Sequence, residues 1–337
     1  MFKNLAWIPL VNKLVLFNYF LNNIEKKKKR GIVKSAPPVI LVESTNMCNL
    51  DCIVCHRFLQ NRKYGQMELE KFKIILKQIP TLSVGLQGFG EPLITKDLID
   101  MIEYCDSKGI LSNFTTNGTL FDDEIINRLS KSKLLTTIAI SFDYIHLEGI
   151  QKKQNLNIYI KNIKKLKEAF ATKRPETNIF FAVTLTKHDL GQLDDMIDLA
   201  RECGISKIVI HNVTIFDSRL KGSMYESPER EDIEKYCSKA RNKGKSMGIE
   251  VDYSYFAKWF NEELEKRICL APWCHTFITW DGYVHPCCHH LDEPFGNIFK
   301  EKWPEIWNGK KYILFRKAFV EGKLDNICRK CKSKEWR

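Results

Sequence analysis

The sequence predicts an α/β fold, because six short apolar runs alternate with longer amphipathic segments between residues 37 and 216. Each pair of segments spans about 30 residues, which is the size of a βα unit. Strict alternation of this kind is typical of a parallel sheet, and six units are fewer than the eight of a closed barrel. We expect strands at 39–43, 83–87, 111–115, 137–141, 179–184 and 207–211.

The segments between these strands have helical periodicity. We expect helices at 67–79, 96–107, 122–130, 158–171 and 190–202. The pattern divides the chain into four parts: an N-terminal amphipathic helix with a basic linker (1–36), the partial barrel (37–216), a connecting helical segment (217–265) and a cysteine-rich module (266–337).

Composition and charge argue against a nucleic-acid partner and against a disulfide-bonded secreted protein. The chain has 337 residues, 44% of them apolar, and a net charge of +12. That charge is spread over lysine-rich segments without an aromatic-interleaved basic platform, so we expect no nucleic-acid partner. No cleavable signal peptide is evident, which favours a cytoplasmic location. In the reducing cytosol, clustered cysteines bind metals more often than they form disulfides, and this chain has twelve cysteines.

The N-terminal residues 2–22 are expected to form a helix with two different faces. Leu10, Leu14, Phe17 and Leu21 share one face, and Asn4, Asn18 and Asn22 share another. Lys13 and the asparagines make it a poor transmembrane span. Two interpretations are open. The helix packs on the barrel, or, with the basic run Lys26–Arg30 behind it, it lies peripherally on an anionic membrane surface.

The first cysteine cluster directly follows the first predicted strand. Cys48, Cys52 and Cys55 have the spacing C-x3-C-x2-C. Ligands bind at the loops that follow the carboxyl ends of strands in βα folds. Three thiolates on one loop can hold three corners of an iron–sulfur cubane and leave the fourth iron open to a small chelating molecule. Taken alone, the trio also fits a zinc site or chance.

Three further polar segments each end a predicted strand. They are Gly88-Phe89-Gly90-Glu91-Pro92 after the second strand, Thr115-Thr116-Asn117-Gly118 after the third and Ser141-Phe142-Asp143 after the fourth. These motifs, their order along residues 37–215 and the cysteine spacing resemble those of the radical S-adenosylmethionine (SAM) superfamily. Phe89 is inserted between the two glycines of that family's GGEP motif.

The resemblance implies a partial (β/α)6 TIM-like barrel, with Cys48, Cys52 and Cys55 holding a [4Fe–4S] cluster whose open iron binds SAM. It also implies a set of SAM-contacting residues. These are Gly88, Gly90, Glu91, Thr116, Asn117, Ser141 and Asp143. The resemblance names no catalytic base.

The second group of cysteines lies in the C-terminal module. Cys269, Cys287, Cys328 and Cys331 could ligate zinc. The segments CxxPW from Cys269 and DGxxxPC from Asp281 instead resemble SPASM/Twitch modules, which carry auxiliary [4Fe–4S] clusters. Only six residues follow Cys331, so we expect the shortened form, with one auxiliary cluster on these four cysteines. Cys288 could replace Cys287, and Cys274 is either a buried thiol or an extra ligand.

The resemblance implies an oxidoreductase that takes electrons from a donor such as flavodoxin or ferredoxin and cleaves SAM to a 5′-deoxyadenosyl radical. The auxiliary cluster then accepts an electron during dehydrogenation of a sugar, cyclitol or lipid-linked glycan. The alternative is a ribosomally made peptide that is oxidised, cross-linked or epimerised. Only 36 residues precede the barrel, too few for an N-terminal leader-binding domain, which favours the small-molecule or glycan class.

Overall fold

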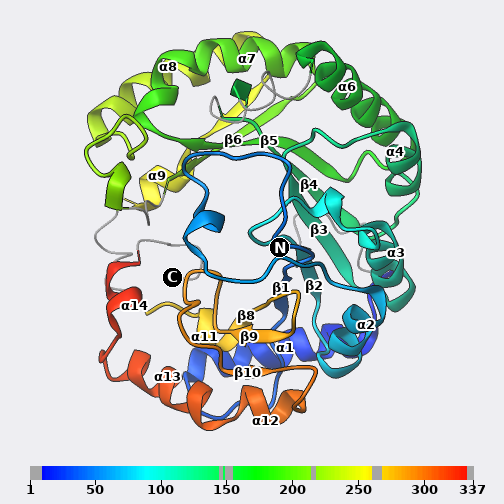
Figure 1. Cartoon of the computed structure of the whole chain (residues 1–337), viewed down its shortest axis with the longest axis vertical. Coiled ribbons are helices and arrows are strands. Elements are labelled where there is room, and N and C mark those ends of the chain that lie inside the picture. Colours follow the sequence, from blue (N-terminus) through cyan, green and yellow to red (C-terminus); the bar gives the residue numbers. More distant parts are fainter. Residues whose placement is uncertain (1–9, 144–146, 149–154, 214–217, 260–267, 332–337) are drawn as a thin grey trace.

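The computed structural model describes residues 10–331, apart from 144–146, 149–154, 214–217 and 260–267. Within these residues, ten strands form one curved sheet in the order β10-β9-β8-β1-β2-β3-β4-β5-β6-β7. Helices surround the outer side of this sheet (Figure 1). The predicted α/β class with a parallel sheet is confirmed.

The six predicted strands are present, and each end lies within two residues of the expected one. They are β1 Val39–Val42, β2 Ser83–Leu86, β3 Leu111–Thr116, β4 Leu135–Ser141, β5 Asn178–Leu185 and β6 Lys207–Asn212. Neighbouring strands pair in parallel throughout. Such strands are apolar because helices cover one face and packed side chains the other.

The five predicted helices are also confirmed, with small shifts of their ends. They are α2 Leu69–Gln78, α3 Leu98–Lys108, α4 Asp123–Leu129, α6 Leu156–Lys173 and α7 Leu193–Glu202. The connecting segment contains α8 Arg230–Ser246 and α9 Ser254–Trp259. The C-terminal part contains α11 Ala271–Cys274, α12 Trp303–Trp307, α13 Lys310–Val320 and α14 Asn326–Lys330. Single 3-10 turns occupy His56–Leu59, Pro92–Ile94, Lys187–Gln192 and Ser218–Leu220.

Sequence analysis missed four strands at the two edges of the sheet. β7 Glu250–Asp252 pairs with β6, and β8 His275–Ile278 pairs in parallel with β1. β9 Tyr283–His285 and β10 Gly296–Asn297 continue the sheet in antiparallel fashion. Strands of two to four residues are too short for periodicity to identify. The cysteine-rich module therefore shares one hydrogen-bonded sheet with the barrel.

The N-terminal helix does not occupy the range expected from the sequence. Helix α1 spans Lys13–Lys28, residues 1–9 lie outside the described part of the chain, and residues 10–12 are not α-helical. Asn12 caps the helix, because its side chain accepts from the Leu14 N–H at 2.9 Å. The last turn contains Lys26–Lys28, whose charges suit the negative end of the helix dipole.

Helix α1 packs on the barrel at the amino ends of the strands, as the first interpretation expected. Val11 and Val15 form a small buried cluster with Leu82, Leu111 and Leu134. Asn18 donates to the carbonyl oxygens of Ala36 and Pro80, and Asn22 donates to that of Trp273 at 2.6 Å. In the described part of the chain, no helix is long and apolar enough to cross a membrane.

A fully buried arginine joins three segments below the barrel. The Arg316 guanidinium donates to the carbonyl oxygens of Gly31, Pro272 and Trp307, each at 2.9 Å. It also stacks over the Trp307 ring at 4.2 Å. Burial lowers the pKa of Arg316 to about 10, so the group is still charged at neutral pH. Because its donors reach backbone oxygens, the linker after α1, helix α11 and helix α12 depend on one side chain.

Replacing Arg316 with leucine leaves those carbonyl oxygens without a donor in a buried place. We expect Arg316→Leu to lower the free energy of unfolding by ~3–5 kcal/mol. Arg128, which pairs with Asp100 and Glu103 at the surface, is the control, and Arg128→Leu should cost ~1 kcal/mol or less. Urea unfolding of both variants measures the difference, and equal losses would contradict the assigned role of Arg316.

Candidate active site

A cavity of about 460 Å³ opens at the carboxyl ends of the parallel strands. It gathers all the residues predicted for the first cluster and for SAM. Cys48, Cys52, Cys55, Gly88, Gly90, Glu91, Thr116, Asn117, Ser141 and Asp143 line it. These residues follow or end β1, β2, β3 and β4, whose carboxyl ends meet at one rim because the strands are parallel. The tertiary structure therefore assembles the site that the motifs predicted.

The three cysteines lie on one tight loop after β1, and each is half-buried. The Cys55 N–H donates to the Cys52 carbonyl oxygen at 3.0 Å, which forms a turn in the loop, and all three cysteines line the cavity. Arg57, nearly buried, donates to the Leu50 carbonyl oxygen at 3.0 Å and fixes the middle of the loop. Burial raises the pKa of the Cys48 thiol. A cationic iron would offset that cost.

The two glycines of the second motif are required by the chain itself. A Cβ on Gly90 would lie 2.4 Å from the Met47 carbonyl oxygen and 2.5 Å from that of Thr45. A Cβ on Gly88 would lie 2.6 Å from the Glu43 side chain. The cysteine loop therefore approaches the β2 loop so closely that only glycine fits.

Glu91 ties the second motif to the third. Its carboxylate accepts from the Thr116 hydroxyl at 2.6 Å and from the Asn117 N–H at 2.7 Å, and the side chain is buried. Asn117 in turn donates to the Asn49 side chain at 2.8 Å, beside Cys48. The motif residues thus form a chain of hydrogen bonds that reaches the cysteine loop.

The end of β4 shows the alternation of an extended chain. Ser141 and Asp143 both line the cavity, whereas Phe142 between them points into the core and stacks on Phe181 with ring centroids 3.6 Å apart. The Asp143 side chain is almost fully buried. The SxD spacing therefore places two polar groups on the same side of the rim.

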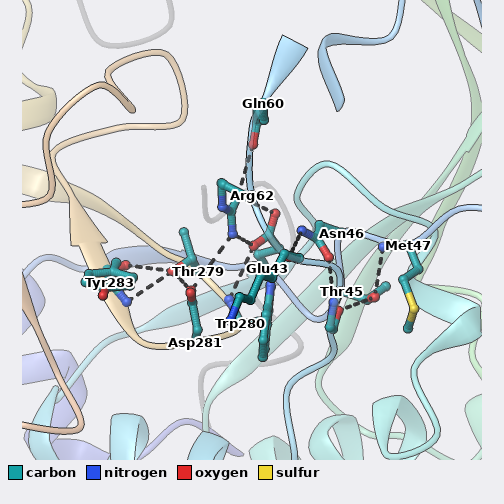
Figure 2. A network of polar contacts seen from close by, with 12 residues as sticks. Glu43, Thr45, Asn46, Met47, Gln60, Arg62, Thr279, Trp280, Asp281 and Tyr283 are labelled. Atoms are coloured by element: carbon teal, nitrogen blue, oxygen red, sulfur yellow. Dashed lines mark hydrogen bonds and ion pairs between the residues drawn. The ribbon is translucent and has the colours of Figure 1, made fainter. Parts of the chain in front are cut away.

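Glu43, which sequence analysis missed, is a fully buried carboxylate directly after β1. It accepts from both Nη atoms of Arg62, at 3.1 and 2.5 Å, and from the Trp280 N–H at 3.3 Å. Figure 2 shows this network, in which Arg62 also approaches Asp281 at 4.0 Å. It joins the cysteine loop to the turn between β8 and β9. A carboxylate at the end of an apolar strand was the available signal.

The four cysteines predicted for the auxiliary cluster lie near one another. Burial and the nearby thiols of Cys269 and Cys331 raise the pKa of Cys287 to about 12. Burial, Asp325, Cys287 and Cys331 raise that of Cys328. His290 lies next to Cys328, because it forms a 2.9 Å hydrogen bond with Asp325, whose charge acts on the Cys328 thiol. Such a thiol group fits an iron–sulfur cluster, whose iron would stabilise the thiolates.

Cys288 and Cys274 differ from this group. Cys288 and His289 line the cavity with Phe277, whereas Cys287 is not among the residues that line it. Cys274 is buried, and its thiol donates to the Leu270 carbonyl oxygen at 3.1 Å. The geometry therefore favours Cys287 over Cys288 as the cluster ligand, and it fits Cys274 as a buried thiol.

Comparisons with known proteins agree with this geometry. The family model of the radical SAM superfamily matches residues 42–200, and the SPASM iron–sulfur cluster-binding domain matches residues 269–332. The chain has the two domains of a SPASM-containing radical SAM enzyme. These domains imply three kinds of cofactor: SAM, a [4Fe–4S] cluster that binds SAM, and auxiliary [4Fe–4S] clusters.

Two known proteins are similar to this chain over most of its length. The PqqA peptide cyclase of Gluconobacter oxydans is 26% identical over 316 residues, covering 89% of this chain and 84% of that protein. The tungsten-containing aldehyde ferredoxin oxidoreductase cofactor-modifying protein of Pyrococcus furiosus is 24% identical over 314 residues, covering 82% of each chain.

Solved structures share the fold. Streptococcus suis SuiB bound to S-adenosylmethionine has a TM-score of 0.65 at 18% identity, covering 92% of this chain and 75% of that chain. The protein anSMEcpe with bound AdoMet has a TM-score of 0.63 at 21% identity, covering 88% of each chain. These likenesses confirm the TIM-like barrel architecture with its C-terminal module.

The close contact at Gly90 gives a test of the first cluster site. Gly90→Ala should displace the cysteine loop, because the new Cβ meets two backbone oxygens that cannot move aside cheaply. We expect a loss of about half the iron after anaerobic reconstitution and at least a tenfold fall in SAM cleavage. Gly191→Ala is the control, since nothing lies within 4 Å of its Cβ. Full iron in Gly90→Ala would contradict the close contact.

Proposed function

We propose that this radical SAM enzyme modifies a ribosomally made peptide or protein by abstracting a hydrogen atom from it. One observation carries the proposal: the likeness to PqqA peptide cyclases extends over 89% of this chain and 84% of the Gluconobacter oxydans protein. It favours the peptide class over the sugar, cyclitol or lipid-linked glycan that the sequence alone favoured. A cyclisation, cross-link or other oxidation of the peptide fits the same starting step.

The chain's own residues position the reaction. When bound, SAM and its cluster supply the 5′-deoxyadenosyl radical that removes the hydrogen atom. Cys48, Cys52 and Cys55, which line the cavity, would hold that cluster. Thr116 and Asn117 are fixed by the Glu91 carboxylate and so are ready to orient SAM at the rim. Other contacts to SAM or substrate come from Gly88, Gly90, Ser141 and Asp143, all of which line the cavity.

The auxiliary cluster is proposed to lie on Cys269, Cys287, Cys328 and Cys331. Four protein thiolates leave no open iron, so this cluster would carry electrons rather than bind substrate. A substrate radical that loses a proton must release one electron to complete a two-electron oxidation. The position of Cys287 beside Cys288 and His289 on the cavity wall supports a short route for that electron. A donor such as flavodoxin or ferredoxin would supply the electron for SAM cleavage.

The first cysteine trio is tested by removing it. Cys48→Ala/Cys52→Ala/Cys55→Ala should lose about half of the iron and all SAM cleavage, because these thiolates are the proposed protein ligands of the cluster that binds SAM. Iron and sulfide analysis under anaerobic conditions and assay of 5′-deoxyadenosine measure both effects. Surviving cleavage would show that the cluster is held elsewhere.

The choice between neighbouring cysteines has its own matched pair. We expect Cys287→Ala to lose the auxiliary cluster, which removes about half the iron while SAM cleavage continues. Cys288→Ala should keep all its iron, because Cys287 is the residue that interacts with Cys269, Cys328 and Cys331, while Cys288 lines the cavity. Iron analysis with electron paramagnetic resonance separates the two clusters. The opposite pattern would exchange the roles of the two residues.

The substrate class is tested by following the abstracted atom. The reconstituted enzyme is reduced with dithionite and incubated with SAM and a uniformly deuterated peptide encoded beside its gene. Deuterium should appear in 5′-deoxyadenosine, together with a mass loss in the peptide. Transfer from a deuterated cyclitol or sugar, without transfer from any peptide, would overturn the peptide proposal and leave the radical SAM assignment intact.

A further inference from the structure

The inner face of helix α1 is only partly apolar, because two polar residues, Asn18 and Asn22, are buried there with Val15. Asn18 is 7% exposed and Asn22 is 1% exposed. Four large apolar side chains face outward: Leu14 is 75% exposed, Phe17 68%, Phe20 62% and Ile24 55%. Residues 14, 17, 20 and 24 are spaced by three and four, so they form one continuous stripe. Contiguous exposed apolar surface of this kind marks an interaction site.

The charge of the segment that carries this stripe is almost entirely positive. Between Leu10 and Lys34 the chain carries seven cationic residues and a single acidic one, Glu25. That carboxylate already accepts from the Lys34 and Ser35 N–H groups. Lys13 precedes the stripe, whereas Lys27 and Lys28 follow it, and all three are exposed. Their long side chains can bury their stems while the ammonium groups reach an anionic surface.

We propose that α1 seats the enzyme on an anionic lipid bilayer as a peripheral anchor lying in the plane of the membrane. The apolar stripe enters the interface between headgroups and acyl chains, and the flanking lysines meet anionic headgroups. A second copy of this chain fits less well. Antiparallel pairing of two stripes would bring Lys13 against Lys27 and Lys28, and parallel pairing would bring Lys27 and Lys28 together. Both arrangements place like charges opposite each other.

The position of α1 in the fold suits this role. The helix covers the amino ends of the strands, since Val11 and Val15 contact Leu82 and Leu111. The cavity opens at the carboxyl ends of the strands, which is the opposite end of the barrel. A bilayer below α1 therefore leaves the mouth of the cavity open to a peptide in solution. Asn18 and Asn22 hold the helix in place by hydrogen bonds, so the stripe needs no rearrangement to reach lipid.

Vesicle flotation of the reconstituted full-length protein tests the anchor. The vesicles contain phosphatidylcholine alone or with about 30% phosphatidylglycerol. We expect binding to the anionic vesicles that weakens in high salt, because screening shortens the range of the lysine charges. Phe17→Ser/Phe20→Ser/Ile24→Ser should bind at least tenfold more weakly. These side chains are more than half exposed, so the variant should keep its iron content and its SAM cleavage.

A matched variant controls for loss of exposed apolar surface in general. Ile74→Ser/Ile158→Ser/Met224→Ser removes three side chains that are 42–50% exposed and lie outside α1, and it should bind like the wild type. The anchor is overturned if the wild type does not float with anionic vesicles, or if both triple variants bind equally. It is also overturned if sedimentation shows a dimer that only the α1 variant loses, because the stripe would then be an interface between copies.

Discussion

The buried ion pair between Glu43 and Arg62 is the constraint on which the site depends. An ionised carboxylate without solvent is costly unless charge and hydrogen bonds surround it. Glu43 meets that need with Arg62 and the Trp280 N–H, which come from the segment after the cysteine loop and from the C-terminal hairpin. Because β1 pairs with both β2 and β8, one side chain at its end fixes the first cluster loop relative to the auxiliary module (Figure 2).

The motif residues around the cavity serve the chain as much as the cofactor. Gly90 is required because the backbone before the cysteine loop lies against it. The two carboxylate oxygens of Glu91 accept hydrogen bonds from Thr116 and Asn117. Preorganised groups of this kind need no rearrangement when a ligand arrives. Contacts within the chain, and not only contacts with the cofactor, therefore determine which residues these motifs contain.

The active-site cavity and helix α1 lie at opposite ends of the barrel strands. At the carboxyl ends, Cys288 and His289 from the C-terminal hairpin complete the wall that Cys48 begins. At the amino ends, α1 turns its asparagines toward the barrel and its phenylalanines away from it. Backbone carbonyl oxygens at strand and helix ends explain the asparagines, because those oxygens need donors that a leucine cannot offer.

The sequence by itself determined the six βα units, the cysteine spacings and the strand-end motifs, since periodicity and local spacing are properties of short segments. It also predicted which four cysteines form the second group. Only the tertiary structure decided which way α1 faces, that β8 extends the sheet beside β1, and that Cys288 rather than Cys287 lines the cavity. These features depend on pairing between residues more than 200 positions apart, such as Glu43 with Trp280, and no local pattern encodes such a contact.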